Sequence, residues 1–320
     1  MSPLPDAIEL HPVRIPMRHR FRRVDHREAV LVKGPSGWGE FSPFPDYRPE
    51  VTTRWLASAL EAACSKLPEP GGRLRIPVNV TIPVVPPEVA AALVGESGAM
   101  TAKVKVGDPG VPAEADEERL DAVVEALGPG GKVRIDVNAV WSLEQATERL
   151  GQLSRFDFEY VEQPVSTVEE MIELRRRTGV RLAADELVRL SPDPLRVVES
   201  GAADVLVVKV QPMGGVARVL DFAGRTKLPI VISSALETSI GMYSGLLAAS
   251  LLDDLPYACG LGTVALLEGD PTLEPRVGFD GFIDVKRVDP DPALLERWRP
   301  DRVRAAEMLR KLRAAARVLT

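Results

Sequence analysis

The sequence predicts an α/β fold in which a parallel sheet closes into a barrel. From about residue 99 onward, short apolar runs alternate with helical patterns through six or seven successive units. Each unit takes about 23 to 31 residues, and repeats of this kind form a parallel sheet with helices outside. A series this long favours a closed barrel over an open sheet. No Gly-x-Gly-x-x-Gly follows any expected strand, which argues against a dinucleotide-binding fold.

The first 95 or so residues have a different, mixed pattern of strands and helices. Strands are expected at 9–17 and 28–34, and the second runs into the turn GPSGWGE. Residues 51–67 have the periodicity of an amphipathic helix. After the turn PEPGG, a further strand is expected at 75–83 and a helix at 86–94. This stretch is therefore expected to form a unit separate from the barrel.

The β-α units after residue 99 are read one by one from their apolar runs and helical patterns. The expected strands lie at 101–107, 132–139, 158–164, 181–186, 204–212 and 229–235. The helices that follow them are expected at 114–128, 142–156, 167–179, 194–201, 214–227 and 238–252. Beyond these we expect a short strand at 257–263, a strand at 279–285 and a basic helical segment at 292–319. That last segment is expected to return to the N-terminal unit, with its Arg and Lys side chains on a solvated face.

Composition limits the class of protein. Of the 320 residues, 45% are hydrophobic and 27% are charged, which is typical of a soluble globular chain with a large core. The net charge of −6 offers no basic footprint for nucleic acid. The N-terminus lacks the pattern of a signal peptide, and no apolar run is long enough to span a membrane. Only Cys64 and Cys259 are present, so a reducing cytoplasm is the expected location.

Polar and charged side chains recur at the ends of the expected barrel strands. In chain order they are Lys103 and Lys105, Asp136 and Asn138, Glu162, Asp185 with Glu186, Lys209, and Ser233 with Ser234. From Lys105 to Lys209, successive ionisable groups are 23 to 31 residues apart, which is one β-α unit each. The C-terminal ends of barrel strands meet on one face, where barrel enzymes have their active sites. These side chains are therefore predicted to converge in one site.

Three of them, Asp136, Glu162 and Asp185, are carboxylates from successive strands. Carboxylates brought together repel one another, and a hard divalent cation offsets that repulsion. All three histidines lie within the first 26 residues and the two cysteines are far apart. Oxygen ligands without nitrogen or sulfur indicate magnesium or manganese rather than zinc. The alternative is that each acid forms a separate salt bridge with its own basic partner. That alternative accounts less well for carboxylates that recur once per β-α unit.

Lysines flank the carboxylates in the chain. Lys103 and Lys105 precede them and Lys209 follows them, so the two sets are expected to face each other across the site. A lysine near other cations has a lowered pKa and can act as a base near neutral pH. The alternative for Lys209 is a surface residue whose stem packs on the protein. Its strand, VLVVKV, is otherwise continuously apolar, which favours a buried position.

The order Lys-x-Lys, Asp-x-Asn, Glu-Gln-Pro, Asp-Glu and Lys, together with GWGEFSPFP at 37–45, resembles the enolase superfamily in its muconate-lactonizing-enzyme-like subgroup. The resemblance covers nearly the whole chain. It implies a modified TIM barrel, (β/α)7β, with an α+β capping domain built from both termini. The capping domain would take residues 1–95 together with the returning segment 266–320, and the catalytic barrel would take residues 96–265.

The resemblance also implies a metal site. The ligands of Mg2+, with Mn2+ as a substitute, would be Asp136, Glu162 and Asp185, supported by Asn138 and Glu186. The shared reaction step of the superfamily is removal of a proton next to a carboxylate, and its sites combine a lysine or histidine base with magnesium. The metal would offset the negative charge that develops in the transition state.

By the same resemblance, Lys105 would be the general acid and base, Lys103 its supporting charge and Lys209 the opposing lysine. The chain has no late histidine, so the catalytic pair of mandelate-racemase-like members is absent. The segment CGLGTVALLEGD lacks the Asp-x-Asp with which dipeptide epimerases hold the substrate amine. The short chain, the compact cap and the segment SSALETSIG are most similar to the dehydratases of menaquinone biosynthesis. These act on 2-succinyl-6-hydroxy-2,4-cyclohexadiene-1-carboxylate.

In such a dehydration, Lys105 would remove the proton beside the ring carboxylate and then protonate the departing hydroxyl, while Lys209 stays protonated. Ser233 and Ser234 are expected to bind the succinyl carboxylate, with ordinary strand-end hydrogen bonding as an equal alternative. The basic segment RHRFRRV at 18–24 is expected to be a mobile cap loop. From it, Arg20 is expected to contact the dianionic substrate, and a solvated basic loop is the alternative.

Other functions stay open at this stage. An N-acylamino acid racemase would use Lys105 and Lys209 as two bases, and a muconate-type cycloisomerase would share the same site. More distant alternatives are a metal-free lyase in which Lys209 forms a Schiff base with a carbonyl, and a non-catalytic binding module. The expected partner is a small carboxylate, with no nucleic acid and no membrane. A monomer is the working expectation for the oligomeric state, which the sequence does not set.

Overall fold

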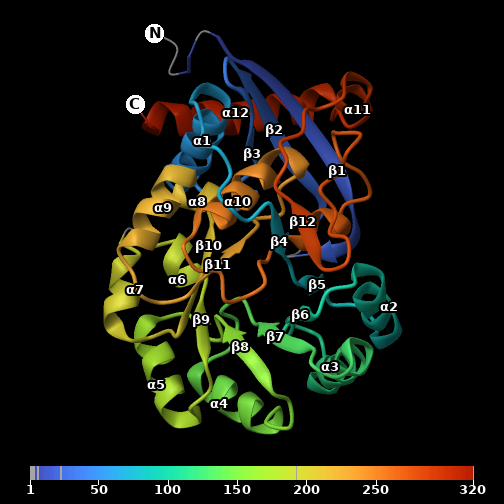
Figure 1. Ribbon diagram of the computed structural model, residues 1–320, viewed down its shortest axis with the longest axis vertical. Helices are drawn as coiled ribbons and strands as arrows, with labels where there is room; N and C mark the ends of the chain where they lie inside the picture. Colours follow the sequence, from blue (N-terminus) through green and yellow to red (C-terminus); the bar gives the residue numbers. More distant parts are fainter. Residues whose placement is uncertain (1–3, 6, 22–23, 192, 320) are drawn as a thin grey trace.

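The computed structural model describes residues 4–5, 7–21, 24–191 and 193–319. The chain forms a barrel and a second unit that lies over one end of it (Figure 1). We call this second unit, which comprises residues 9–64 and 302–319, the cap. The cap therefore combines a segment near the start of the described chain with the last helix (Figure 1). No helix in the described residues is long and apolar enough to cross a membrane.

The cap is a three-stranded antiparallel sheet covered by helices from both ends of the chain. Its elements are β1 (Glu9–Phe21), β2 (Val24–Gly34), β3 (Gly37–Phe41), α1 (Pro49–Cys64) and α12 (Arg302–Leu319). Val30 of β2, Trp55 of α1 and Leu312 of α12 are buried in one hydrophobic cluster. Burying a side chain of this size contributes roughly 1.5–3 kcal/mol. The C-terminal helix is therefore part of the cap core.

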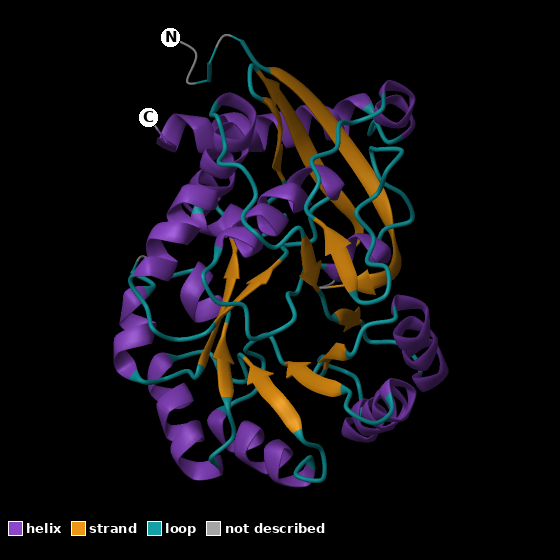
Figure 2. Ribbon diagram, viewed as in Figure 1, coloured by secondary structure: helices purple, strands orange, loops and turns teal. Residues whose placement is uncertain are grey.

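The barrel is built on a parallel sheet whose strands are neighbours in chain order. The strands are β5 (Val80–Ile82), β6 (Thr101–Lys105), β7 (Lys132–Asp136), β8 (Phe158–Glu162), β9 (Leu182–Ala184), β10 (Val205–Lys209) and β11 (Ile230–Ser233). Figure 2 shows the helices on the outside of this sheet. Most residues of these strands are buried, as expected for parallel strands covered on both faces.

A short segment at residues 259–260 closes the sheet into a ring. Gly260 forms a parallel bridge to Ser233 at the end of β11, and Cys259 forms a parallel bridge to Val78 just before β5. The backbone N–H of Gly260 donates to the carbonyl of Ile232 at 2.8 Å, which continues the hydrogen bonding of β11. The short last strand expected at 257–263 is therefore present as this closing segment.

Helices connect successive barrel strands, and a few short elements complete the fold. The connecting helices are α2 (Pro87–Ser97), α3 (Ala113–Leu127), α4 (Leu143–Gln152), α5 (Val168–Thr178), α6 (Glu186–Arg189), α7 (Leu195–Ser200), α8 (Val210–Met213), α9 (Val216–Gly224) and α10 (Ser239–Leu251). The remaining elements are β4 (Arg75–Pro77), β12 (Phe282–Asp284), α11 (Pro292–Arg297) and a 3-10 helix at Gly262–Leu266. Capping boxes begin two helices, Ser142 with Gln145 at α4 and Thr167 with Glu170 at α5.

Two expectations about the N-terminal region differ from the structure. The strand expected at 75–83 is split: β4 pairs with β12, and β5 pairs with β6 inside the barrel sheet. Lys103 and Lys105 therefore lie on the second strand of that sheet, not the first. The expected cap loop at 18–24 is also wrong in part, because β1 continues to Phe21 and β2 begins at Val24, while residues 22–23 lie outside the described residues. Neither difference could be predicted from the local pattern, because pairing with other strands decides where these strands begin and end.

Candidate active site

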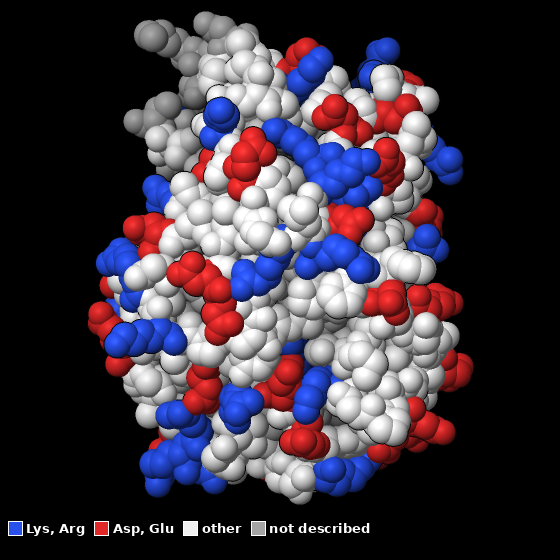
Figure 3. Space-filling view, in the orientation of Figure 1, with Lys and Arg blue, Asp and Glu red and all other residues white. Residues whose placement is uncertain are grey.

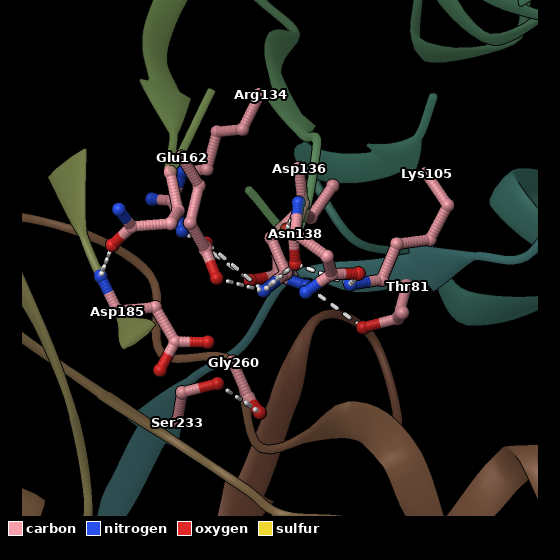
Figure 4. Close-up of polar contacts among 12 residues, drawn as sticks. Thr81, Lys105, Arg134, Asp136, Asn138, Glu162, Asp185, Ser233 and Gly260 are labelled. Atoms are coloured by element: carbon pink, nitrogen blue, oxygen red, sulfur yellow. Dashed lines mark hydrogen bonds and ion pairs between the residues drawn. The ribbon is translucent and has the colours of Figure 1, made fainter. Parts of the chain in front are cut away.

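The parallel register gathers the predicted polar residues at one rim of the barrel. Lys105 of β6 pairs with Asp136 of β7, and Asp136 pairs with Glu162 of β8. Asp185 directly follows β9, and Lys209 ends β10. All five side chains are buried. Figure 4 shows the three carboxylates side by side, with Lys105 and Asn138 on one flank.

Lys103 lies between two of the carboxylates. Its Nζ donates to Oδ2 of Asp136 at 3.1 Å and to both carboxylate oxygens of Glu162 at 2.9 Å. Burial alone would lower the pKa of Lys103, but the charges of Glu162 and Asp136 outweigh it and raise the pKa above its ordinary value. Lys103 is therefore a permanent positive charge in the floor of the site.

Lys105 has a different environment although it is only two residues away. Its Nζ donates to Oδ2 of Asp136 at 2.5 Å and to Oδ1 of Asn138 at 2.6 Å. The Phe21 ring lies over it, with its centroid 5.2 Å from Nζ. Burial lowers the pKa of Lys105 below its ordinary value, against the charge of Asp136 and with a contribution from Lys103. Of the two lysines on this strand, Lys105 is the one suited to release and take up a proton.

Lys209 approaches from the other side of the carboxylates. Its Nζ donates to Oδ2 of Asp185 at 2.6 Å, while Nε of Arg189 donates to Oδ1 of Asp185 at 2.9 Å. Arg189 also donates to Glu186 and to the hydroxyl of Tyr47 from the cap. Asp185 therefore has a cation on each oxygen, and one of these cations is tied to the cap.

The pKa values of the three acids diverge. Burial would raise the pKa of Asp136, but Lys105 and Lys103 hold it well below its ordinary value. Burial likewise opposes ionisation of Asp185, yet Arg189 and Lys209 lower its pKa. Burial and the neighbouring charge of Asp136 raise the pKa of Glu162 to about 7. Pairs of titratable groups whose pKa values are driven apart are typical of functional sites.

A small cavity of about 20 Å3 is lined by Lys103, Lys105 and Lys209. Phe21 and Phe44 from the cap side also line it. A wider cavity of about 730 Å3 reaches Lys105 from outside and also contacts Phe21. The candidate site is thus narrow at the reacting groups and opens outward past Lys105.

The residues expected to bind the substrate differ in their exposure and in their hydrogen-bond partners. The hydroxyl of Ser233 donates to the Gly260 carbonyl at 3.3 Å, and the hydroxyl of Ser234 is 2.5 Å from that of Thr263. Both serines line the small cavity, with their hydroxyls engaged in strand-end hydrogen bonds. Arg20 is exposed at the mouth of the wider cavity, 3.9 Å from Asp25. A role in substrate binding stays a prediction for all three.

Asn138 and Glu186 join the two sides of the site. The Asn138 side-chain amide donates to Oε1 of Glu186 at 3.2 Å while its carbonyl accepts from Lys105. The backbone of Asn138 has φ of 52°, in the left-handed region that asparagine tolerates better than most residues. Sequence reasoning missed Arg189 and Tyr47. The spacing of Arg189, four residues after Asp185 and thus one helical turn, was the available signal for it.

The three buried carboxylates supply the oxygen donors that a hard divalent cation takes. Among the described residues, no three His, Cys, Asp or Glu side chains stand together as a ready-made metal site. The reason is that Asp136 and Glu162 point at the ammonium of Lys103, and Asp185 points at Lys209. The donor set fits a divalent cation in its chemistry, and in the structure lysines offset the negative charge.

Fold and site together define a barrel enzyme with lysines and three buried carboxylates at one rim, and the chain belongs to the enolase superfamily. A sequence model described as "Enolase C-terminal domain-like" matches residues 87–290, and one described as "Enolase N-terminal domain-like" matches residues 13–63. Sites of this superfamily combine a divalent metal with a lysine or histidine base.

Curated relatives cover most of the chain. It is 50% identical over 275 residues to o-succinylbenzoate synthase of Thermobifida fusca, and the aligned residues make up 86% of each chain. It is 48% identical over 314 residues to o-succinylbenzoate synthase of Mycobacterium marinum, and the aligned residues make up 94% of each chain.

Solved structures agree with the fold. Muconate lactonizing enzyme from Pseudomonas fluorescens, complexed with muconolactone, superposes with a TM-score of 0.76 at 19% identity, over 92% of this chain and 98% of that chain. The N-succinyl Arg/Lys racemase of Bacillus cereus superposes with a TM-score of 0.75 at 18% identity, over 92% of this chain and 97% of that chain.

Proposed function

We propose that this protein is a metal-dependent dehydratase that forms o-succinylbenzoate from 2-succinyl-6-hydroxy-2,4-cyclohexadiene-1-carboxylate, a step of menaquinone biosynthesis. The observation that carries the proposal is the placement of Lys105 and Lys209 on one cavity beside three buried carboxylates. The relatives named o-succinylbenzoate synthase, at 45–50% identity over most of the chain, support the choice of substrate.

Lys105 is the residue that moves protons. In its neutral form, its Nζ takes the proton from the ring carbon that bears the carboxylate. The same Nζ then gives that proton to the hydroxyl on the adjacent ring carbon, which leaves as water while the ring becomes aromatic. The lowered pKa of Lys105 favours the neutral form that this cycle needs.

Lys209 contributes charge, not proton transfer. Held by Asp185 at 2.6 Å, its ammonium stays next to the cavity and stabilises negative charge on the ring. Asp136, Glu162 and Asp185 would hold Mg2+, which as a Lewis acid would offset the negative charge that develops next to the substrate carboxylate. Phe21 and Phe44 exclude water from the reacting groups.

The dehydration is tested directly by ultraviolet absorbance, because the product is aromatic and the substrate is a conjugated diene. Purified protein with Mg2+ and the cyclohexadiene substrate should yield o-succinylbenzoate and one equivalent of water. Absence of turnover by folded protein with Mg2+ present would overturn the proposal. Turnover that is unchanged by removal of all divalent cations would favour the metal-free Schiff-base alternative, which borohydride trapping on Lys209 would then reveal.

Racemisation of N-acylamino acids is a second candidate activity, because both lysines line the same cavity. A racemase uses Lys105 and Lys209 as two bases, one on each face of the substrate carbon. Incubation of N-succinyl amino acids with the protein in D2O separates the cases by mass spectrometry. Deuterium incorporation with inversion, as fast as dehydration, would assign racemisation as a main activity.

A further inference from the structure

Two segments far apart in the sequence, GWGEF at 37–41 and SSALETSIG at 233–241, meet at the boundary between cap and barrel. Glu40 of β3 is buried and points at the first turn of α10. Its carboxylate accepts from the hydroxyl of Thr238 at 2.5 Å, from the Thr238 backbone N–H at 3.1 Å and from the Gly241 backbone N–H at 3.0 Å. A residue of the cap therefore caps a barrel helix.

A second cap residue binds the turn just before that helix. Arg27 of β2 is buried, and its Nε donates to the carbonyl of Leu236 at 2.7 Å. Its Nη2 donates to the carbonyl of Ala235 at 2.9 Å and also to that of Ser42 in the cap. Two adjacent strands of the cap thus bind one short stretch of barrel backbone, residues 234–238, which we call the rim turn.

The rim turn is strained and faces the candidate active site. Leu236 has φ of 64°, a conformation that costs free energy for a residue with a branched side chain. Strain of this kind persists only where the surrounding contacts over-determine the backbone. Ser234, Ala235 and Leu236 line the small cavity together with Lys209. The contacts from the cap therefore hold one wall of that cavity in a conformation that the turn would not favour alone.

We propose that Glu40 and Arg27 are positioning residues, which set the shape of the rim turn and so the fit of the substrate beside Lys209. This inference rests on the proposed function and deepens it. Neither residue lines the small cavity, so each acts through the rim turn. The cap then contributes to the site by holding a barrel segment as well as by covering it.

A purely structural role for Glu40 is the competing explanation, and the chain offers a matched control for it. Glu61 of α1 in the cap also caps a barrel helix, since its carboxylate accepts from the backbone N–H groups of Val216 at 2.6 Å and Ala217 at 3.0 Å. That helix, α9, lines neither cavity of the candidate site. Glu40→Gln and Glu61→Gln therefore make the same chemical change at the same kind of contact, and only Glu40 reaches the rim turn.

The experiment compares the two variants by steady-state dehydration with Mg2+ and by hydrogen–deuterium exchange. In Glu40→Gln one acceptor oxygen becomes an amide donor that faces Thr238, so we expect KM to rise about tenfold with kcat changed less than about threefold. The backbone amides of residues 234–241 should also exchange faster. In Glu61→Gln the faster exchange should be confined to residues 214–220, and kcat/KM should stay within about twofold of the unsubstituted protein. Equal losses of kcat/KM in the two variants would overturn the proposal.

Arg27→Lys provides a second route if Glu40→Gln does not fold, because it keeps the charge but cannot reach both carbonyls with a planar fork. The same increase in KM and the same faster exchange at residues 234–241 are expected. Unchanged KM and exchange would refute the inference. Failure of the unsubstituted protein to dehydrate the substrate would instead refute the proposed function, and the exchange comparison would still show whether Glu40 and Arg27 hold the rim turn.

Discussion

Lys103 donates hydrogen bonds to both carboxylate oxygens of Glu162, each at 2.9 Å, and both side chains are buried. The same ammonium reaches Asp136 at 3.1 Å. One cation thus offsets two buried carboxylates from neighbouring strands, and these carboxylates are among the residues that would hold the metal of the proposed function. This arrangement holds the two carboxylates close together on one ammonium group.

Replacement of Lys103 by Met should therefore destabilise the protein markedly. Removing one partner of a buried ion pair leaves an uncompensated charge and typically costs about 3–5 kcal/mol. Urea denaturation should show this loss, and Mg2+ should raise the melting temperature of Lys103→Met more than that of the unsubstituted protein. Lys132→Met, at an exposed lysine that begins the neighbouring strand β7, should leave stability within about 0.5 kcal/mol. Similar denaturation midpoints for the two variants would contradict the prediction.

Replacement of Lys105 by Ala should remove the proton carrier without unfolding the chain. Loss of a positioned acid-base group lowers turnover by about 10²–10⁴-fold. We therefore expect kcat for dehydration to fall by at least about 10³-fold, while the far-ultraviolet circular dichroism spectrum is unchanged. Lys227→Ala, at an exposed lysine between α9 and β11, should retain full activity. Turnover by Lys105→Ala at more than about a tenth of the unsubstituted rate would exclude Lys105 as the base.

Chelation should abolish dehydration but not folding. The carboxylates Asp136, Glu162 and Asp185 each have a lysine partner, so residues of the chain itself offset their charges. EDTA should eliminate turnover, and added Mg2+ or Mn2+ should restore it, while circular dichroism is unchanged throughout. Loss of secondary structure upon chelation would show that the metal is structural.

Stability should fall as pH rises from about 4.5 to about 7 because of Glu237. Burial and the neighbouring charge of Glu40 raise its pKa from 4.5 to about 7, against the charge of Arg27. The folded protein thus binds a proton in this range that the unfolded chain has released, so this carboxyl contributes a loss of roughly 3 kcal/mol across the window. Glu237→Gln keeps a carbonyl that can accept from the Ala235 N–H and removes the titration. Its unfolding free energy should depend less steeply on pH between 4.5 and 7, and an unchanged slope would count against this account.

Much of the fold and site was predictable from local pattern. The apolar runs marked barrel strands, and the ionisable groups at intervals of one β-α unit marked their ends. The parallel register then brings these groups together, because strands of similar length in one sheet end at the same rim. The prediction was wrong where long-range pairing overrides local pattern. The segment 75–83 is divided between two sheets, and β1 extends through residues 18–21.

The difference between Lys103 and Lys105 also needed the structure. Both point into the site from one strand face, as their spacing indicates. Only the packed structure shows that Lys103 has two carboxylates around it, whereas Lys105 has one carboxylate and an amide. That difference in partners sets the opposite directions of their pKa shifts.

The surface is consistent with the composition. Positive and negative side chains are interspersed over the face shown in Figure 3, as expected for a chain whose acidic and basic residues nearly balance. On this face, charges of one sign among the described residues do not gather into a broad patch.

The sequence by itself determined the barrel and the chemical type of each strand-end group, because these follow from short-range periodicity and from the order of residues along the chain. The superfamily was indicated by the resemblance of its motifs to known members. The tertiary structure alone decided how the cap contributes, through Arg189 with Tyr47 and through Glu40 with Thr238. These partners are separated by more than a hundred residues. Contacts over such distances depend on how two units pack against each other, and no local pattern of residues encodes that packing.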